Sequence, residues 1–266
     1  MDKLFLHQAR RHRGQIEAHQ LSLYISHSDF QLSILLVSTQ PHERTIGARL
    51  LGQRLCLFYI KNLCDALKIE QCLYPRLAIC EALVNMGSAC VSSLSKLIGK
   101  VGNNHETKLP IKYFRKNSYP LARDIAVRTL INIGDPAIDC IINLTKTNDD
   151  FYLSQLIDAL GGLLHKTKDL RIVNELRLIL DRVKPYELLE WKIIRAFSAA
   201  DNIDLSFMMH YLDHPQPSIR WETIRTLGMV GYSNPKLLTR LKELLLDSNE
   251  EVRLASHDAL IRISKK

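Results

Sequence analysis

One pattern of residues recurs along this chain and limits what the chain can fold into. The stretch YPRLAICEALVNMG at residues 74–87 returns as YPLARDIAVRTLINIG at residues 119–134. Both copies open on a tyrosine and a proline, place a leucine seven residues after an arginine, and close on a glycine. A unit this short cannot bury its own apolar side chains, so repeated units must stack and share one core.

The arginine of the pattern reveals further copies. Five copies hold an arginine with a leucine seven residues later, and these arginines are Arg44, Arg76, Arg123, Arg220 and Arg253. Two weaker copies begin at Leu153 and Glu190 and keep an apolar residue at the seventh position. The seven starts are 32, 47, 30, 37, 30 and 33 residues apart, and a period near this value is typical of an α-solenoid with two helices in each unit.

The apolar residues predict helices joined by tight turns. They recur at steps of three and four residues through most of the chain, as in the segment 237–245. In GDPAIDCIINL, Gly134 suits the left-handed residue that ends a helix, while Asp135 suits the cap and Pro136 the first turn of the next helix. GYSNPKLL repeats this device at residues 231–235.

Together these features predict an all-α fold, a right-handed α-α superhelix of about seven helical hairpins. We expect one domain over residues 1–266, with an N-terminal capping helix at residues 1–28. The long 47-residue step indicates an insertion, which we place at residues 103–119.

The pattern also carries a family resemblance. Small residues in the second helix, a closing glycine and an Asp-Pro or Asn-Pro opening of the next hairpin resemble the HEAT repeat, in the short variety of the phycobilin-lyase-type repeat proteins. The clearest stretch is SIRWETIRTLGMVGYSNPKLLTRLKELLLDSNEEVRLASHDALIRI, and the resemblance covers roughly residues 30–264. It implies the α-solenoid architecture, but the family includes scaffolds, enzymes and nucleic-acid-binding proteins.

Composition and motifs exclude several function classes. Apolar residues at 46% and charged residues at 24% are ordinary for a globular chain, and the longest uninterrupted apolar runs are far shorter than a membrane helix of about 18 residues. The N-terminus lacks the apolar stretch of a signal peptide, so we expect a cytoplasmic protein. The six cysteines form no CxxC pair and are expected to be small buried hydrophobic residues. No catalytic, metal or cofactor motif is visible, so we expect a protein that is not an enzyme and needs no cofactor.

The recurring arginines fall on the core side of each second helix, at its N-terminal edge. One interpretation makes them a ladder of binding residues. The other, which we favour, has each arginine bridge to an acidic side chain or a carbonyl group of the neighbouring repeat.

Positions five and nine after the arginine point away from the core. The resemblance implies that these second helices line the concave surface of the array. The charge of the residue at position five mostly alternates in sign from one repeat to the next. This pattern suits a protein-binding surface of mixed charge, or a solvated face on which neighbouring residues pair with each other. The candidate partner-binding residues on this face are Arg49, Gln53, Asn85, Arg128, Asn132, Arg195 and Arg225.

The net charge of +8 is concentrated in the N-terminal half. Residues 1–134 hold 18 Lys+Arg and 9 Asp+Glu, a net charge of +9, whereas residues 135–266 hold 18 and 19. Basic residues mixed with aromatic residues bind nucleic acids by phosphate contact and stacking, so nucleic-acid binding is the alternative function. Its candidate residues are Arg10, Arg11, Arg13, Lys108, Lys112, Tyr113, Arg115 and Lys116.

Two other interpretations of the insertion stay open. Its aromatic residues would pack on the array while its lysines stay solvated, or the basic residues would bind an acidic protein.

A relative of the HEAT-like alkylpurine DNA glycosylases would need a basic groove with aromatic residues and an acidic residue. Trp191, Trp221 and Asp158 are the available residues, but the mixed charges at position five disfavour it.

Overall fold

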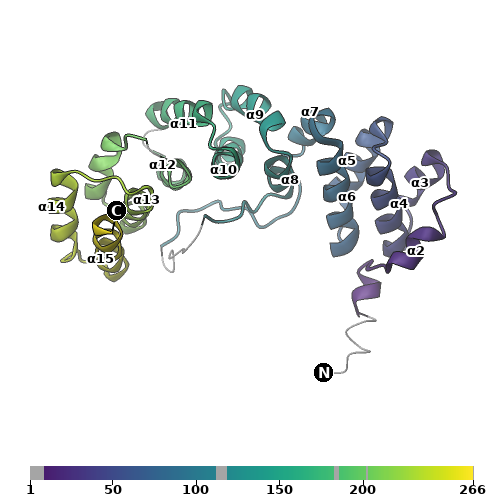
Figure 1. Ribbon diagram of the computed structural model, residues 1–266, viewed down its shortest axis with the longest axis horizontal. Helices are drawn as coiled ribbons and strands as arrows, with labels where there is room; N and C mark the ends of the chain where they lie inside the picture. Colours follow the sequence, from purple (N-terminus) through teal and green to yellow (C-terminus); the bar gives the residue numbers. More distant parts are fainter. Residues whose placement is uncertain (1–8, 112–118, 183–185, 202, 266) are drawn as a thin grey trace. The chain divides into compact units, whose positions relative to one another are not determined.

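The computed structural model describes residues 9–111, 119–182, 186–201 and 203–265, and it confirms the all-α fold. Within these residues the regular elements are α-helices and short 3-10 helices, and no strand occurs (Figure 1). The chain forms two compact units. Unit 1 comprises Met1–Asn103 and Asp124–Cys140, and unit 2 comprises Asn104–Arg123 and Ile141–Lys266.

Unit 1 stacks the second helices of successive hairpins. Helix α4 packs on α6, and α6 packs on α8, while the intervening helices α3, α5 and α7 contact the second helices of their own or the next hairpin. The helices of unit 1 are α2 (Ala18–Ser22), α3 (Asp29–Leu35), α4 (Pro41–Gln53), α5 (Ile60–Ile69), α6 (Leu73–Met86), α7 (Val91–Ser95) and α8 (Ile125–Ile133).

Unit 2 repeats this arrangement. Helix α10 packs on α12, α12 on α13 and α13 on α15, with α11, the 3-10 helix η4 and α14 as the first helices of the hairpins. Helix α9 (Ile138–Leu144) crosses the division between the units. The other helices of unit 2 are α10 (Asp150–Thr167), α11 (Leu170–Arg182), α12 (Glu187–Phe197), η4 (Ser206–Asp213), α13 (Pro217–Val230), α14 (Pro235–Leu244) and α15 (Glu250–Ser264).

The turns between helices follow the predicted chemistry in one case and depart from it in the other. Asn234 caps α14, because its side-chain oxygen accepts a 2.7 Å hydrogen bond from the Leu237 N–H. Gly134 ends α8 with a positive φ of 87°, as predicted. Asp135 does not cap the following helix: it begins a short 3-10 turn, Asp135–Ala137, whose N-cap residue is Gly134.

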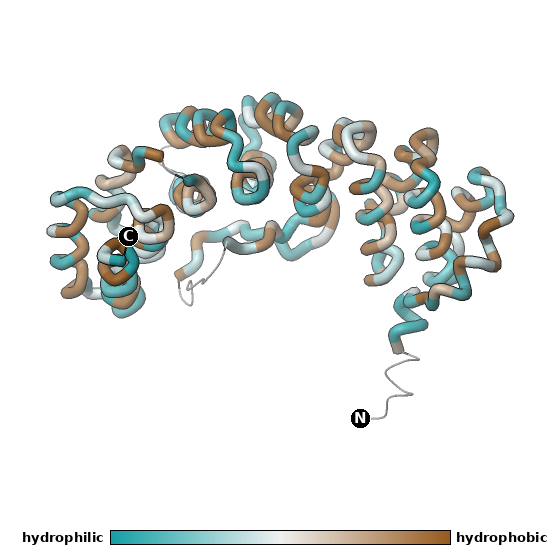
Figure 2. The backbone as a smooth tube through the Cα atoms, in the orientation of Figure 1, coloured by the Kyte–Doolittle hydropathy of each residue, from teal (hydrophilic) through white to brown (hydrophobic). Residues whose placement is uncertain are grey.

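The register of the repeats is confirmed by burial. Leu130 and Leu227, at the seventh position of their copies, are both fully buried. Apolar and polar residues alternate around the helices of both units, as the colours of Figure 2 show. Each hairpin therefore contributes an apolar stripe to a core that it shares with its neighbours.

The N-terminal cap is not one helix. Residues 9–12, the first described residues, are helical, and α2 follows after a break at Gly14, whose φ is +90°. The Gly14 carbonyl accepts a 2.7 Å hydrogen bond from Thr45 Oγ1, and the Tyr74 N–H donates to the Arg13 carbonyl. The break therefore lets the segment follow the N-terminal ends of α4 and α6.

One helical stretch, Leu73–Ser95, is long and apolar enough to cross a bilayer by length and composition. The sequence prediction counted only uninterrupted apolar runs and missed it. In the fold, this stretch is divided at Gly87, where φ is 61°, into α6 and α7. Helix α6 packs between α4 and α8, and a core helix of this kind passes the same test.

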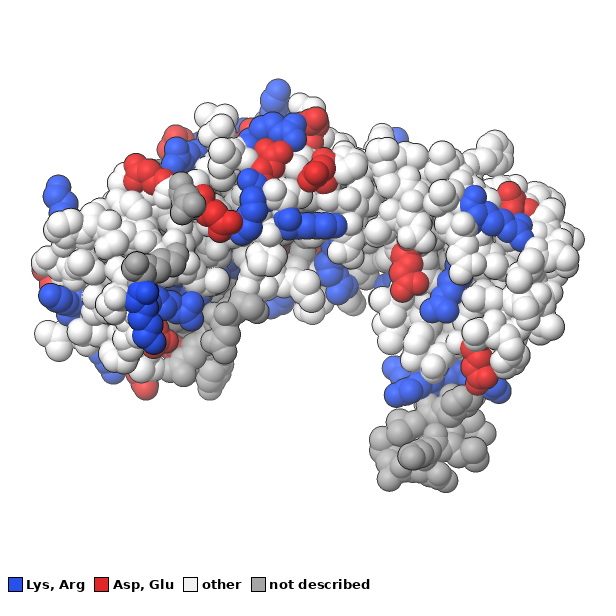
Figure 3. Space-filling model, viewed as in Figure 1, with Lys and Arg blue, Asp and Glu red and all other residues white. Residues whose placement is uncertain are grey.

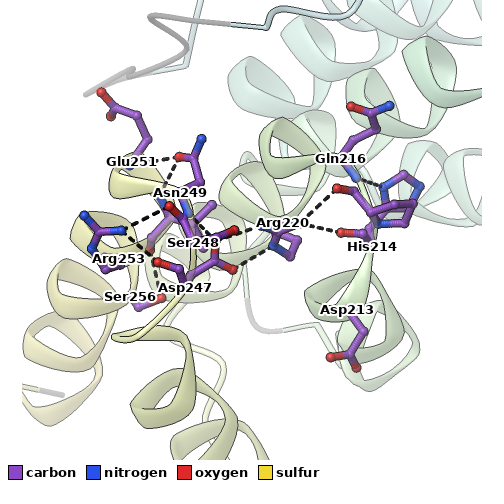
Figure 4. Close-up of polar contacts among 12 residues, drawn as sticks. Asp213, His214, Gln216, Arg220, Asp247, Ser248, Asn249, Glu251, Arg253 and Ser256 are labelled. Atoms are coloured by element: carbon purple, nitrogen blue, oxygen red, sulfur yellow. Dashed lines mark hydrogen bonds and ion pairs between the residues drawn. The ribbon is translucent and has the colours of Figure 1, made fainter.

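Two of the recurring arginines, Arg44 and Arg220, join neighbouring repeats, so the structural interpretation is confirmed for these two. Arg44 donates to both carboxylate oxygens of Glu70, at 2.7 and 2.9 Å. Arg220 does the same with Asp247, at 2.9 and 2.7 Å (Figure 4). Each acid lies 26 or 27 residues later, just before the next second helix.

The arginine of the following second helix contacts the same acidic residue, because its side chain donates to the backbone carbonyl of that residue. Arg76 donates to the Glu70 carbonyl, and Arg253 donates to the Asp247 carbonyl at 2.8 Å. Arg123 is different, because it pairs with Glu106 at 3.2 Å and its side chain is 47% exposed. One acidic residue thus links two consecutive second helices at each of these two junctions.

Burial acts to raise the pKa of Asp247, but the hydrogen bonds from Arg220 and from the Asn249 N–H outweigh it, so its pKa lies below the ordinary value. A carboxylate with a lowered folded-state pKa stabilises the protein above its unfolded-state pKa of about 4. That contribution is lost as the pH falls through the folded-state pKa.

We expect Leu227→Ala to lower the free energy of unfolding by about 2–5 kcal/mol, because it leaves a cavity in the shared core. Urea denaturation measures the change. Leu246→Ala is the matched control, since that leucine is 89% exposed. Identical unfolding curves for Leu227→Ala and the wild type would contradict the register of the repeats.

We expect Arg220→Ala to destabilise the protein by about 3–5 kcal/mol at pH 7, because it leaves the nearly buried Asp247 carboxylate without its counter-charge. Arg123→Ala, at an exposed pair, should cost no more than about 1 kcal/mol. Below about pH 4 the difference between Arg220→Ala and the wild type should shrink, because Asp247 becomes protonated. A difference that stays constant down to pH 2 in thermal melts would exclude the ion pair as its source.

Candidate partner-binding faces

Unit 1 presents an open face along its second helices. Positions five and nine of α4, α6 and α8 lie at the surface, and they form one row of charged residues and one row of amides. Arg49 is half-buried and the other five are exposed; the six residues are Arg49, Glu81 and Arg128 at position five, and Gln53, Asn85 and Asn132 at position nine. Five of the seven predicted partner-binding residues therefore lie on this face, where their role stays a prediction.

A hollow of about 190 Å³ lies between α4 and α6 on this face. It is lined by Arg49, Gln53, Ala78, Glu81, Ala82 and Asn85. The helices approach closely because Gly52 has no side chain: a Cβ there would lie 2.6 Å from the Ala82 Cα. Arg49 lines this hollow, and its Nε atom is buried without a hydrogen-bond partner, which is an unfavourable state for a donor.

The corresponding face of unit 2 is covered, so the prediction that Arg195 and Arg225 point outward is wrong. Both side chains are buried, as is Asp158 at the equivalent position of α10. The segment Asn104–Arg123, which we call the strap, belongs to unit 2 and contains the predicted insertion except for residue 103. The described residues of the strap lie beside α10 and α12 (Figure 1), and Glu106 and Tyr119 line a hollow together with Asp158 and Arg195.

A network of ion pairs lies beneath the strap. Asp158 accepts from Lys192 Nζ at 2.8 Å and from Arg195 Nη2 at 2.7 Å. Arg195 Nη2 also lies 3.0 Å from a carboxylate oxygen of Glu106, which pairs in turn with Arg123. The strap thus supplies the second carboxylate that the buried guanidinium of Arg195 contacts.

The charges hold one another in their ionised states. Burial acts to raise the pKa of Asp158, but Lys192 and Arg195 outweigh it, and the pKa lies below its ordinary value. Burial acts to lower the pKa of Arg195, while Asp158 and Glu106 raise it above the ordinary value of a guanidinium. Removing one member would leave an uncompensated buried charge.

Tyr119 anchors the other end of the strap. A Cβ placed on Gly161 of α10 would lie 1.8 Å from the Tyr119 hydroxyl oxygen, so the tyrosine occupies space that only a glycine leaves open. The ring stacks on His165, with centroids 5.5 Å apart and planes 13° from parallel. Burial raises the pKa of Tyr119 well above its ordinary value, so the hydroxyl stays protonated at neutral pH.

The tryptophans do not form a base-stacking surface. Trp191 is fully buried with the Arg195 guanidinium 4.4 Å from its ring centre, and Trp221 is 5% exposed. Arg225 bonds to Glu222 and Ser198 within the same buried layer. The groove of basic, aromatic and acidic residues that a glycosylase-like function needs is therefore absent from the described residues.

The basic residues predicted to bind nucleic acid are only partly described. Arg10, Arg11, Arg13 and Lys108 are exposed, and Arg11 lies 3.6 Å from Glu17. Figure 3 shows basic side chains gathered beside the N-terminal residues of unit 1. The remaining residues of this prediction, Lys112, Tyr113, Arg115 and Lys116, lie outside the described residues. The two described ends of the strap pack on unit 2, which agrees with the packing interpretation for Glu106 and Tyr119.

Cysteines and metals add no chemistry to either face. All six cysteines are free thiols; Cys64 and Cys90 are buried as predicted, and the other four are half-buried. Burial raises the pKa of Cys90 to about 11, so this thiol is a weak nucleophile and a weak ligand at neutral pH. Across the described part of the chain, no group of three His, Cys, Asp or Glu residues is placed to hold a metal ion.

The fold and these faces define an all-α helical-repeat protein. A family model for HEAT repeats matches residues 173–261, which extend from α11 to α15. Residues 173–261 thus match the HEAT-repeat family, and the resemblance seen in the sequence is confirmed over those residues.

Solved structures and curated proteins add little to this assignment. An engineered protein from a structural genomics consortium is 15% identical, with a TM-score of 0.44 and coverage of 90% of this chain and 99% of that chain. A designed armadillo repeat protein is 15% identical, with a TM-score of 0.42 and coverage of 88% and 98%. Neither likeness is close enough to carry an argument. No curated protein matches the sequence.

We expect Asp158→Asn to destabilise unit 2 by about 3–5 kcal/mol, because Lys192 and Arg195 would lose the carboxylate between them. Asp258→Asn is the matched control: it lies at the same position of its repeat, on α15, with a side chain that is 72% exposed. Chemical denaturation should show a change of no more than about 0.5 kcal/mol for the control. Equal effects of the two substitutions would contradict the burial of this network.

Proposed function

We propose that this protein is a non-catalytic scaffold that binds an extended segment of a partner protein along the α4–α6–α8 face of unit 1. The observation that carries the proposal is the hollow between α4 and α6, with its polar lining and the unsatisfied Nε of Arg49. The six free thiols suit a reducing compartment, so we place this function in the cytoplasm.

The amide row suits the backbone of an extended peptide. Side-chain amides both donate and accept hydrogen bonds, as peptide groups do. Packed helices lie about 8–10 Å apart, and an extended chain advances about 3.3 Å per residue. Gln53, Asn85 and Asn132, one on each second helix, would therefore meet roughly every third peptide group of a segment that crosses the helices.

The charged row favours a protein over a nucleic acid. Arg49 and Arg128 lie on either side of Glu81 in the order of the helices. A polyanion with evenly spaced phosphates would meet a like charge at Glu81, whereas a peptide can place a basic residue there and acids beside it. The exposed Arg10, Arg11 and Arg13 support the competing proposal, nucleic-acid binding by the N-terminal segment.

We expect the double variant Arg49→Ala/Asn85→Ala to lose its protein partner. The protein is used as bait in a cell extract, with and without nuclease. A partner retained by the wild type after nuclease treatment should bind the double variant at least about tenfold more weakly, which corresponds to about 1.4 kcal/mol.

The triple variant Arg10→Ala/Arg11→Ala/Arg13→Ala is the control and should retain the partner. Loss of capture on nuclease treatment, together with failure of the triple variant, would replace the scaffold proposal by nucleic-acid binding. The salt dependence of binding to a generic DNA or RNA would then flatten in the triple variant, because fewer counterions are released.

A further inference from the structure

The strap contacts unit 2 as a bound peptide would. Among its described residues it forms no helix, and its side chains contact unit 2. Glu106 forms an ion pair, and Tyr119 stacks on His165. His105 lies edge to face on Phe151 of α10, with ring centroids 5.4 Å apart. Glu106 meets Arg195 of α12, and Tyr119 enters the space above Gly161 of α10. The contacts are therefore a carboxylate on a guanidinium and an aromatic ring in a slot.

Two large apolar side chains of the strap are exposed. Ile111 is 85% exposed and Leu121 is 82% exposed, so these two side chains contribute almost nothing to holding the strap in place. Among the described residues, Glu106, Tyr119 and His105 make side-chain contacts that hold the strap to unit 2. Contacts of this kind can be released without unfolding the hairpins beneath them.

The strap also satisfies the polar groups of this face incompletely. The Nε of Arg195 is buried and has no hydrogen-bond partner, although its side chain is only 4% exposed. On the neighbouring α13, Glu222 Oε2 is likewise buried without a partner. A hollow of about 100 Å³ remains between the strap and Arg195. A buried donor without an acceptor is unfavourable, so a segment that reaches it would bind better than the strap does.

We infer that the face of α10 and α12 beneath the strap is a second peptide-binding face, and that a partner segment with a carboxylate and a tyrosine occupies it by displacing the strap. The carboxylate takes the place of Glu106 on Arg195, where both the Nε and Nη2 atoms can donate to it. The tyrosine ring takes the place of Tyr119 against His165. This inference concerns unit 2 and does not depend on the function proposed for unit 1.

The strap is tethered at both ends, which gives it a high effective concentration at its own site. For short flexible tethers this is about millimolar, so an external segment competes poorly until the strap is weakened. The intact chain is therefore expected to hold the face closed against weak ligands and to open it only for segments that bind more strongly than the strap.

The test uses a fluorescent synthetic peptide of residues 103–123 and the full-length chain. The double variant Glu106→Ala/Tyr119→Ala removes the two strap side chains that the partner segment would replace, and it substitutes no residue of α10 or α12. Fluorescence anisotropy should show that the peptide binds this variant at least about tenfold more tightly than it binds the wild type. A peptide with the same two substitutions should not bind.

Two further variants separate a peptide site from general loosening of the fold. Lys108→Ala/Ile111→Ala changes exposed strap residues and should behave as the wild type. Adding Gly161→Ala to the double variant should abolish peptide binding, because the new methyl group fills the tyrosine slot. Alanine favours the α10 helix, but its Cβ would also lie 3.0 Å from the Ala196 Cβ, so circular dichroism checks that each variant folds.

Equal affinity of the peptide for the wild type and the double variant would overturn the inference, as would binding that survives Gly161→Ala. If the double variant fails to fold, hydrogen exchange on the wild type with excess peptide decides: faster exchange in residues 104–111 is expected, and unchanged exchange overturns the inference. A wild-type dimer that the peptide dissociates would identify a second copy of this chain as the occupant and overturn the assignment to a partner. None of these outcomes involves α4, α6 or α8.

Discussion

The ion pair between an arginine near the start of one second helix and the acid that precedes the next is the contact on which the stacking depends. Arg44 with Glu70 and Arg220 with Asp247 have the same two-pronged geometry, and each acid also receives an arginine through its backbone carbonyl. Helix packing through apolar stripes tolerates sliding, whereas a guanidinium and a carboxylate meet in one geometry. These pairs therefore set the register in which the apolar stripes meet.

With the register set, every second helix offers the same positions to its surroundings, and the two units use them differently. In unit 1, positions five and nine are at the surface and line a polar hollow. In unit 2, position five holds Asp158, Arg195 and Arg225. Asp158 pairs with Arg195, and Arg225 pairs with Glu222 of its own helix. One repeat sequence thus provides an open face in one unit and a filled face in the other.

The filled face indicates what chemistry the repeats accept. Arg195 Nη2 contacts carboxylates from both sides, Asp158 from its own layer and Glu106 from the strap. Arg49 on unit 1, whose Nε also has no hydrogen-bond partner, lines the hollow between α4 and α6. An arginine beside an acid and an amide selects an extended segment with mixed side chains, and it disfavours a uniform polyanion.

The sequence by itself determined the helical hairpins, the repeat register and the structural role of the arginines, because these follow from local periodicity and from contacts with the adjacent repeat. Leu130 and Leu227 were found from spacing alone, and so was the surface position of Asn85. Only the tertiary structure decided that Arg195 and Arg225 are buried. Periodicity shows that a side chain points away from its own hairpin core, but it cannot show that an inserted segment returns to cover it, since an irregular segment carries no periodic signal. Charge alone also failed to show that Glu106 of the insertion meets the repeats.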